Sequence, residues 1–332
     1  MRFAVALRAL APALGLLAAP PGYHILNTYT IGGTGGWDYV AFDTVGHRLF
    51  VSRQTRVQVL DPETGKLLGE IPGMVNAHGV AFAYEFNHGF ATSGRDSTIT
   101  MFDIKTLQVL GRAKAALDAD AILYDPATKR VFSFNGDSHS STAVDPKTGQ
   151  VIGTVDLGAG PEFGVSAGDG KLYVNLEDEG EIAEIDANAL KVTRRWPMGS
   201  CKAATGLAID RVHHRLFSGC RSKIMAISDY TAGKFLTSFP IDGAVDAAAF
   251  DPGTGYAFTS NGAGSITIVH EDSPDTFSLA GNVPTMLGAR TMTVDPKTHK
   301  LYLVTAKFAP QADSTARPKM IPDSFTLIVL GM

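Results

Sequence analysis

Residues 245–261 read VDAAAFDPGTGYAFTSN, which is two short apolar runs joined by a tight turn. In the turn, an Asp side chain can accept backbone N–H groups, Pro252 fixes its own φ, and Gly255 tolerates left-handed geometry. Aromatic and β-branched residues in the second run are typical of strands. The stretch therefore predicts an antiparallel strand pair.

The aromatic residue of the second run recurs along the whole chain. Its copies are 40 to 44 residues apart, at Phe50, Phe90, Phe132, Tyr173, Phe217, Phe258 and Tyr302. This period is typical of a four-stranded propeller blade, whereas a helical solenoid would show apolar residues at helical spacing. Turn aspartates follow in step, at Asp61, Asp103, Asp145, Asp186, Asp229 and Asp272. Seven repeats predict an all-β, seven-bladed β-propeller.

The seventh repeat has only three strands before the chain ends, the last of them at 325–330. A β-rich segment at 23–31 precedes the first complete blade. If it supplies the missing outer strand, the ring closes and only short, protected sheet edges remain. We therefore expect one domain, residues 20–332.

Composition and charge narrow the class of protein. The chain has 332 residues with 35 glycines and 17 prolines, which suits a fold with many turns. The net charge is −4, and it becomes −6 without Arg2 and Arg8 of the first nineteen residues. This balance argues against a nucleic-acid partner, which normally requires a clustered basic face.

The first nineteen residues predict a signal peptide. A basic start with Arg2 and Arg8 is followed by the uncharged apolar stretch 9–19, which is too short to span a bilayer. The mature protein is then periplasmic or secreted, without a membrane segment; a retained anchor is the alternative. Strand pairing brings Cys201 and Cys220 to the same end of blade five, which favours a disulfide over two buried thiols.

The strand phrases resemble a known repeat. The stretches 50–53 (FVSR), 173–176 (YVNL) and 258–261 (FTSN) look like degenerate copies of Tyr-Val-Thr-Asn. The mature chain resembles the YncE-like YVTN-repeat β-propellers of bacteria, and segments 35–39, 270–275, 304–308 and 321–326 resemble an exported branch. The resemblance implies the seven-bladed fold and export. It implies little about chemistry, because one fold hosts many functions.

Polar residues are expected at the mouth of the central channel, where the innermost strands begin. Counting back five residues from the end of each predicted innermost strand gives Asp38, His78, Asp120, Glu162, Thr205, Asp246 and Arg290. Glu162 requires a turn one residue shorter in blade four; without it the position is Pro161. Carboxylates so close together repel, so some are protonated, or Arg290 pairs with them, or a cation is held.

These residues define the predicted site. Catalytic roles fall to Asp38, His78, Asp120, Glu162, Asp246 and Arg290, and the first five of these are also the predicted metal ligands for Ca²⁺, Mg²⁺ or Zn²⁺. Ligand contacts are assigned to Thr205, Trp37, Tyr39, Arg53, Arg95 and Asn261. A salt-bridged plug that merely closes the channel is the alternative to a site.

Two classes of function fit. The first is an enzyme, a hydrolase, lactonase or lyase, acting on a small anionic or polyhydroxylated substrate with or without a divalent cation. The second is a non-catalytic scaffold or a propeller that binds a ligand or a partner. The absence of any complete catalytic motif favours this second class.

The same propeller predicts a monomer that could meet a protein partner on its rim. Two further clusters lie far from the channel mouth. His213 and His214 are interpreted as part of a turn. The denser cluster of His270, Glu271, Asp272 and Asp275 could bind metal, but it is interpreted as a capped turn.

Overall fold

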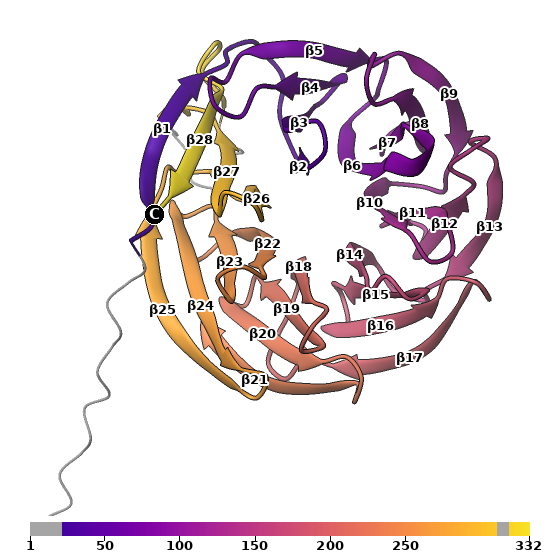
Figure 1. Ribbon diagram of the computed structural model, residues 1–332, viewed down its shortest axis with the longest axis vertical. Coiled ribbons are helices and arrows are strands. Elements are labelled where there is room, and N and C mark those ends of the chain that lie inside the picture. Colours follow the sequence, from indigo (N-terminus) through magenta and orange to yellow (C-terminus); the bar gives the residue numbers. More distant parts are fainter. Residues whose placement is uncertain (1–21, 311–318) are drawn as a thin grey trace, which may run out of the picture.

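The computed structural model describes residues 22–310 and 319–332, so the predicted signal peptide lies outside the described residues. Seven four-stranded antiparallel sheets surround a central channel (Figure 1). The innermost strand of each sheet lines the channel, and the outermost strand lies at the rim. The seven-bladed β-propeller predicted from the repeats is confirmed.

The first four blades follow one another along the chain. Blade one contains β2 (Val40–Asp43), β3 (Arg48–Arg53), β4 (Arg56–Leu60) and β5 (Leu67–Pro72). Blade two contains β6 (Ala77–Ala83), β7 (His88–Ser93), β8 (Thr98–Asp103) and β9 (Val109–Lys114). Blade three contains β10 (Ala119–Asp125), β11 (Arg130–Asn135), β12 (Ser140–Val144) and β13 (Val151–Asp156). Blade four contains β14 (Pro161–Ser166), β15 (Lys171–Leu176), β16 (Glu181–Asp186) and β17 (Lys191–Pro197).

The last three blades complete the ring. Blade five contains β18 (Ala204–Asp210), β19 (Arg215–Cys220), β20 (Ile224–Asp229) and β21 (Lys234–Pro240). Blade six contains β22 (Val245–Asp251), β23 (Tyr256–Asn261), β24 (Ser265–Ser273) and β25 (Thr276–Pro284). Blade seven contains β26 (Thr291–Asp295), β27 (Lys300–Thr305), β28 (Thr326–Gly331) and β1 (His24–Thr30).

The ring closes through β1, which pairs antiparallel with β28 from His24 opposite Gly331 to Thr30 opposite Thr326. Figure 1 shows β1 and β28 side by side in blade seven. The N-terminal strand thus supplies the outer strand that the seventh repeat lacks, as predicted.

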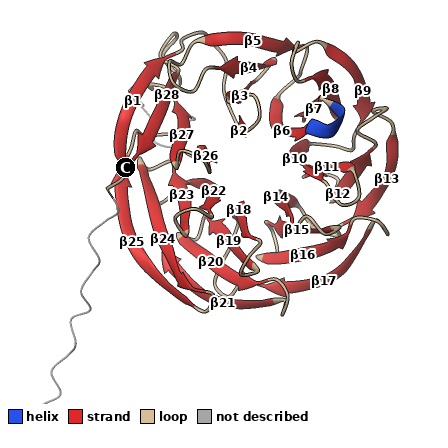
Figure 2. Ribbon diagram, viewed as in Figure 1, coloured by secondary structure: helices blue, strands red, loops and turns tan. Residues whose placement is uncertain are grey.

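Helical structure is almost absent from the described part of the chain. It amounts to one 3₁₀ turn, η1 (Tyr84–Phe86), drawn in blue in Figure 2. Among the described residues, no helix is long and apolar enough to cross a bilayer.

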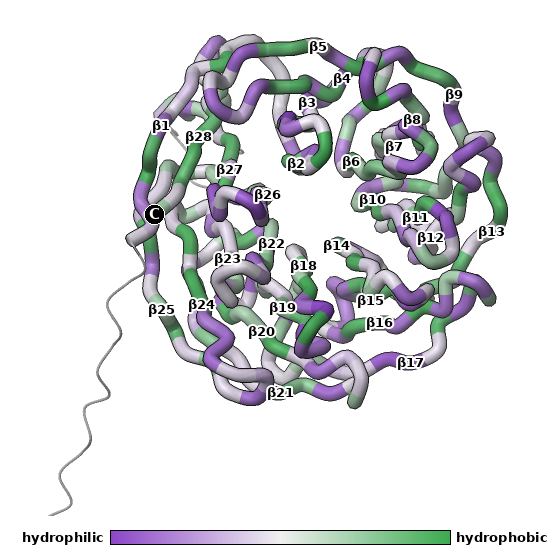
Figure 3. The backbone as a smooth tube through the Cα atoms, in the orientation of Figure 1, coloured by the Kyte–Doolittle hydropathy of each residue, from purple (hydrophilic) through white to green (hydrophobic). Residues whose placement is uncertain are grey.

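The aromatic anchors of the repeat form the core between blades. All seven are at most 1% exposed. Phe50 stacks on Phe102 of blade two with ring centroids 5.9 Å apart, and Phe217 stacks on Phe250 of blade six at 5.2 Å. Along the rim, hydrophobic and hydrophilic segments alternate (Figure 3). Each anchor therefore fills the layer between its own blade and the next, which explains why it recurs once per blade.

A disulfide joins Cys201 to Cys220, with their Cα atoms 5.5 Å apart. Cys220 ends β19, where it lies opposite Ala204 of β18. The bond therefore ties the loop before the innermost strand of blade five to the second strand of the same blade.

Candidate functional site

The innermost strands aim their polar residues into the channel by means of β-bulges. Register shifts interrupt the pairing of five innermost strands near their first residues, between Ala77 and Val80, Ala119 and Ile122, Pro161 and Gly164, Ala204 and Leu207, and Val245 and Ala247. Each interval contains one member of the predicted ring. A bulge bends the strand and redirects a side chain, so the same irregularity repeated in five blades builds one convergent site.

The repeat phrase holds these bulges in place. Two residues after the aromatic anchor, the side chains of Ser52 and Thr92 donate to the backbone carbonyls of His78 and Asp120 in the next blade. Two further blades repeat the arrangement, with Asn175 Nδ2 donating to Thr205 at 3.1 Å and Ser260 donating to Arg290. The polar third position of the repeat therefore fastens the backbone of the site to the neighbouring blade.

His78 lies between two carboxylates. Its Nδ1 contacts Asp38 Oδ2 and is 3.3 Å from Asp120 Oδ1, while the Asn76 amide nitrogen lies 2.6 Å from Nε2. Burial alone would lower the pKa of His78, but the hydrogen bond with Asp38 and the charges of both carboxylates raise that pKa to about 9. Within the described part of the chain, Asp120 Oδ1 is buried and has no hydrogen-bond partner beyond this 3.3 Å contact. The three side chains are close enough to hold one metal ion.

Asp246 faces two arginines on the other side of the chamber. Arg290 Nε is 2.8 Å from Asp246 Oδ2, and Arg221 lies 3.7 Å from the other oxygen. Arg221 also pairs with Glu177 at 3.0 Å. Burial raises the pKa of Asp246 to about 6 despite the charges of both arginines. This half of the site therefore combines carboxylates with guanidinium groups that could orient an anionic group.

Glu162 and Tyr39 complete the chamber. Burial, followed by the charges of Asp120 and Glu177, raises the pKa of Glu162 well above its usual range. Burial likewise raises the pKa of Asp120, and that of Tyr39 rises because of burial and the surrounding carboxylates. Glu162 is therefore protonated at neutral pH and can act as a hydrogen-bond donor. Together with Asp246 and both arginines, these groups line a cavity of about 190 Å³.

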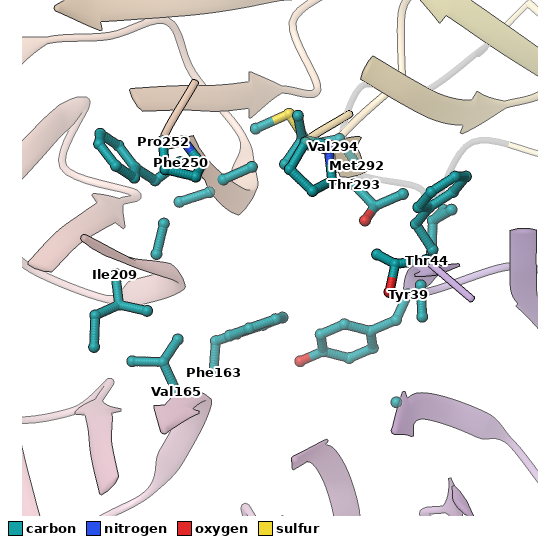
Figure 4. Close-up of a pocket in the computed structure, with 18 of the residues that line it drawn as sticks. Tyr39, Thr44, Phe163, Val165, Ile209, Phe250, Pro252, Met292, Thr293 and Val294 are labelled. Atoms are coloured by element: carbon teal, nitrogen blue, oxygen red, sulfur yellow. The ribbon is translucent and has the colours of Figure 1, made fainter. Parts of the chain in front are cut away.

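An aromatic pair separates this polar chamber from the rest of the channel. Tyr39 of blade one and Phe163 of blade four meet across the channel with ring centroids 5.4 Å apart, as Figure 4 shows. Beyond them lies a cavity of about 720 Å³ with a mostly apolar lining that includes Val165, Ile209 and Phe250. The channel therefore has a polar chamber at one end and an apolar chamber at the other.

The structure brings together the six ring residues that were assigned catalytic roles, and Tyr39 with them. Glu162 lines the cavity because the turn after β14 is shorter than the corresponding turn in blade five. In blade four, the N–H of Ala167 donates to the carbonyl of Lys171, four residues later. In blade five, Asp210 lies opposite Arg215, five residues later.

The other predicted ligand contacts lie apart from the cavity. Thr205 is buried and donates to the carbonyls of Gly219 and Val245, at 3.3 and 3.2 Å. Arg53 is fully buried, with its guanidinium 3.7 Å above the Phe325 ring and bonded to the carbonyls of the 34–36 segment. Trp37 packs on the same Phe325 ring at 5.4 Å.

Two further members of that group have other surroundings. Asn261 is buried and donates to Ser265 and Thr267 at 3.2 and 3.0 Å. Arg95 is exposed on a loop. Neither residue lines the polar chamber.

Three residues of the site were not assigned from the sequence. Arg221 and Glu177 come from loops after the second strands, where differing loop lengths hide their position. Phe163 could have been found from the residues that directly follow the ring residues. Five of these are small, and only Tyr39 and Phe163 are aromatic: Tyr39, Gly79, Ala121, Phe163, Gly206, Ala247 and Thr291. Two aromatic residues from blades on opposite sides of the channel are the signal.

Comparison with known proteins defines the fold only. No family model matches the chain, and no curated protein sequence matches it. Among solved structures the chain is similar to Kuenenia stuttgartiensis hydrazine synthase, with a TM-score of 0.71 and 16% sequence identity, over 83% of this chain and 94% of that chain. This likeness supports a β-propeller and carries no activity to the present chain.

The raised pKa values predict a thermal stability that falls as the pH rises from 5 to 9 in the absence of metal ions. Asp246 stabilises the fold below its ordinary pKa of 3.8 and loses that contribution as the pH passes about 6; His78 does the same between 6.5 and about 9. The part of the Asp246 shift that lies inside this window, from pH 5 to about 6, corresponds to about 1.4 kcal/mol, or on the order of 2 °C.

Melting temperatures measured in EDTA across this pH range test the prediction. The variant Glu162→Gln should flatten the slope, since it removes one acid from the coupled group. Glu271, whose pKa burial raises to about 8, adds a slope of its own, so the difference between variant and parent isolates the chamber. An identical slope in both proteins would contradict the interpretation.

Proposed function

We propose that the polar chamber binds a small polar ligand with the help of a divalent cation. The observation that carries the proposal is the group of Asp38, His78 and Asp120, whose ligand atoms lie within 4.8 Å of one another. Apart from His78 at 3.3 Å, the buried Asp120 Oδ1 has no hydrogen-bond partner among the residues that the structure describes. A cation would bind that oxygen and compensate the negative charge of the surrounding carboxylates. Without a cation, burial and mutual repulsion favour their protonated forms.

The donor set favours Zn²⁺ over Ca²⁺ and Mg²⁺. Asp38 and Asp120 offer carboxylate oxygens, but the third group is the imidazole of His78. Imidazole is a ligand that zinc accepts readily, whereas Ca²⁺ and Mg²⁺ prefer oxygen alone. Three protein ligands leave coordination positions for water or for an oxygen atom of the ligand.

The groups around the cation suit chemistry on a small oxygen-rich molecule. A bound divalent cation would polarise a carbonyl oxygen or lower the pKa of a water molecule. Glu162 lines the same cavity and could give a proton to a leaving oxygen, and Arg221 and Arg290 could orient an anionic group. These roles fit a hydrolase, lactonase or lyase acting on a small anionic or polyhydroxylated substrate.

A second candidate is a non-catalytic propeller whose ring only closes the channel or holds a ligand. The ion pairs His78–Asp38 and Arg290–Asp246 favour it, because they already satisfy part of the buried charge. The cavity of about 190 Å³ is also smaller than the pockets that usually hold organic ligands, which are about 300–1,000 Å³.

We further propose that the protein is exported to the periplasm or secreted and is a YncE-like YVTN-repeat propeller. The leader pattern of residues 1–19 and the Cys201–Cys220 disulfide support export, because disulfides persist in oxidising compartments. The repeat phrases support the family assignment.

A titration of Zn²⁺ into EDTA-treated, desalted protein tests the cation site. We expect Asp38→Asn and Asp120→Asn each to lose one equivalent of zinc that the parent binds, as counted by calorimetry and elemental analysis. Asp137→Asn is the matched control, since Asp137 is an exposed acid on a loop after a second strand. Equal zinc binding by all four proteins would refute the site.

Turnover separates the two candidate functions. The zinc-loaded parent is assayed with a panel of lactones and carboxylate esters of polyhydroxylated acids. If it is an enzyme, Glu162→Gln should retain zinc and lose at least about a hundredfold in rate, because a positioned proton donor contributes about 10²–10⁴. Zinc binding without turnover of any compound would favour the binding protein.

A further inference from the structure

Blade six carries a buried carboxylate where the earlier blades carry an apolar side chain. In blade five, Asp229 faces Arg215 and is followed by Tyr230; in blade six, His270 faces Tyr256 and is followed by Glu271. The residues at this position in blades one to five are all buried and apolar: Pro62, Ile104, Pro146, Ala187 and Tyr230. The substitution of a glutamate therefore calls for a compensating partner.

The side chain of Glu271 is only 1% exposed. Among the described residues, its carboxyl oxygens have no hydrogen-bond partner apart from the His213 imidazole, 3.2 Å from Oε1, and the neighbouring Asp210 carboxyl group. The nearby Arg215 is used elsewhere, because its guanidinium bonds to Asp275 at 3.0 Å and to the carbonyl of Pro274 at 2.7 Å. An ionised carboxylate in such surroundings is costly unless it is paired or coordinates a metal.

Two further ligand atoms converge on Glu271 from blade five. Asp210, at the end of β18, is 3% exposed, and its Oδ2 lies 2.8 Å from His213 Nδ1. The same nitrogen is 3.2 Å from Glu271 Oε1. Backbone N–H groups of Val212 and His213 bond to the Asp210 carboxylate, at 2.8 and 3.2 Å, and fix its position.

These separations are those of ligands that share one ion. Metal bonds of about 2.0–2.1 Å to nitrogen and oxygen place neighbouring ligand atoms about 3 Å apart. The ligand atoms of Asp210, His213 and Glu271 all lie within 4.8 Å of one another. His213 is half-exposed, so an ion can enter from solvent and keep water on its remaining positions.

We propose that Asp210, His213 and Glu271 form a second metal site, which takes Zn²⁺ or a similar first-row divalent cation and clamps blade five to blade six. Imidazole with two carboxylates is a donor set that such ions accept. The site lies at the ends of the innermost strands, opposite the polar chamber, and Asp210 also lines the apolar chamber. The ion reinforces the contact that Arg215 makes with the hairpin at Pro274 and Asp275.

Zinc titration of the EDTA-treated full chain at pH 7.5 tests this site independently of the proposed function. We expect zinc at about a hundredfold excess over its dissociation constant to raise the melting temperature of the parent by several degrees. Glu271→Gln and His213→Gln should each lose one equivalent of zinc and the part of that rise that it causes. Asp38→Asn, which removes a ligand of the polar chamber, should keep the equivalent of zinc that depends on Glu271 and the part of the rise that this equivalent causes.

Two more variants keep the test decisive. Glu271→Leu restores the apolar character of the other blades, so it should melt higher than the metal-free parent. In the Asp38→Asn background, where the polar chamber is also disabled, it should not respond to zinc. His270→Gln, at the adjacent position but outside the cluster, should behave as the parent. If Glu271→Leu and His213→Gln bind zinc and respond to it as the parent does, or if zinc does not stabilise the parent, Asp210 and Glu271 share a proton instead and the proposal is wrong.

Discussion

Deletion of Tyr23–Ile31 is expected to abolish the cooperative unfolding of the propeller. The deletion removes β1, whose pairing with β28 is the closure between the two ends of the chain. All six residues of β28 are buried. Without β1 beside it, β28 becomes an exposed apolar edge strand that can pair with another molecule. We expect a broad transition and aggregation in calorimetry and light scattering.

A single side chain reports on the same closure. Tyr23 packs on Phe258 of blade six with ring centroids 5.3 Å apart, and its hydroxyl donates to the carbonyl of His299 in blade seven at 2.8 Å. Tyr23→Ala should therefore cost about 3–5 kcal/mol. His24→Ala, an exposed position on β1, should cost little. A truncated chain that melted sharply at the temperature of the parent would show that β1 does not close the ring.

The fold could be predicted because its physical causes repeat. Each blade must bury one large side chain against the next, so aromatic residues such as Phe50 and Phe258 recur once per blade and reveal the period. The closing strand could be found by counting, since the seventh repeat lacks one strand. The role of the polar third position of the repeat, as in Ser52, could not be predicted from the sequence. Its hydrogen-bond partner is a backbone carbonyl in another blade, which only the structure shows.

The candidate site could be predicted only where it follows the repeat. Asp120 and Asp246 occupy the same bulge in different blades, so one count from the strand ends finds both. Arg221 lies on a loop of variable length, and no count reaches it. Thr205 shows the opposite case. Its position in the repeat predicts a ring residue, but its hydroxyl group donates to backbone carbonyls of blades five and six instead of facing the chamber.

Glu271 was interpreted as part of a capped turn for a different reason. Its neighbours His270 and Asp272 suggest a polar turn, and the two do bond to each other at 2.6 Å. The informative comparison runs across blades, where the same position holds apolar residues such as Ile104 and Tyr230. A departure from a repeat at a buried position is the signal to look for.

Opposite effects of Arg290→Gln and Glu162→Gln are expected on stability at pH 8 without metal ions. Asp246, with a pKa of about 6, is ionised there, and Arg290 Nε at 2.8 Å is its nearest counter-charge. The loss of that charge should cost about 2 kcal/mol, less than for a fully buried pair because Arg290 is half-exposed. Glu162→Gln keeps the shape of the protonated carboxyl group and removes the free-energy cost of holding its proton at pH 8, so the melting temperature should rise.

The pH separates charge from packing in this pair of variants. At pH 5 Asp246 is largely protonated, so the destabilisation caused by Arg290→Gln should shrink, whereas a loss of packing would persist. Arg95→Gln, an exposed arginine outside the chamber, is the control. If Arg290→Gln costs as much at pH 5 as at pH 8 and Glu162→Gln also destabilises, the ring is a structural plug. The expected pattern instead requires uncompensated negative charge in the chamber, and this charge is what a cation or a cationic ligand would neutralise.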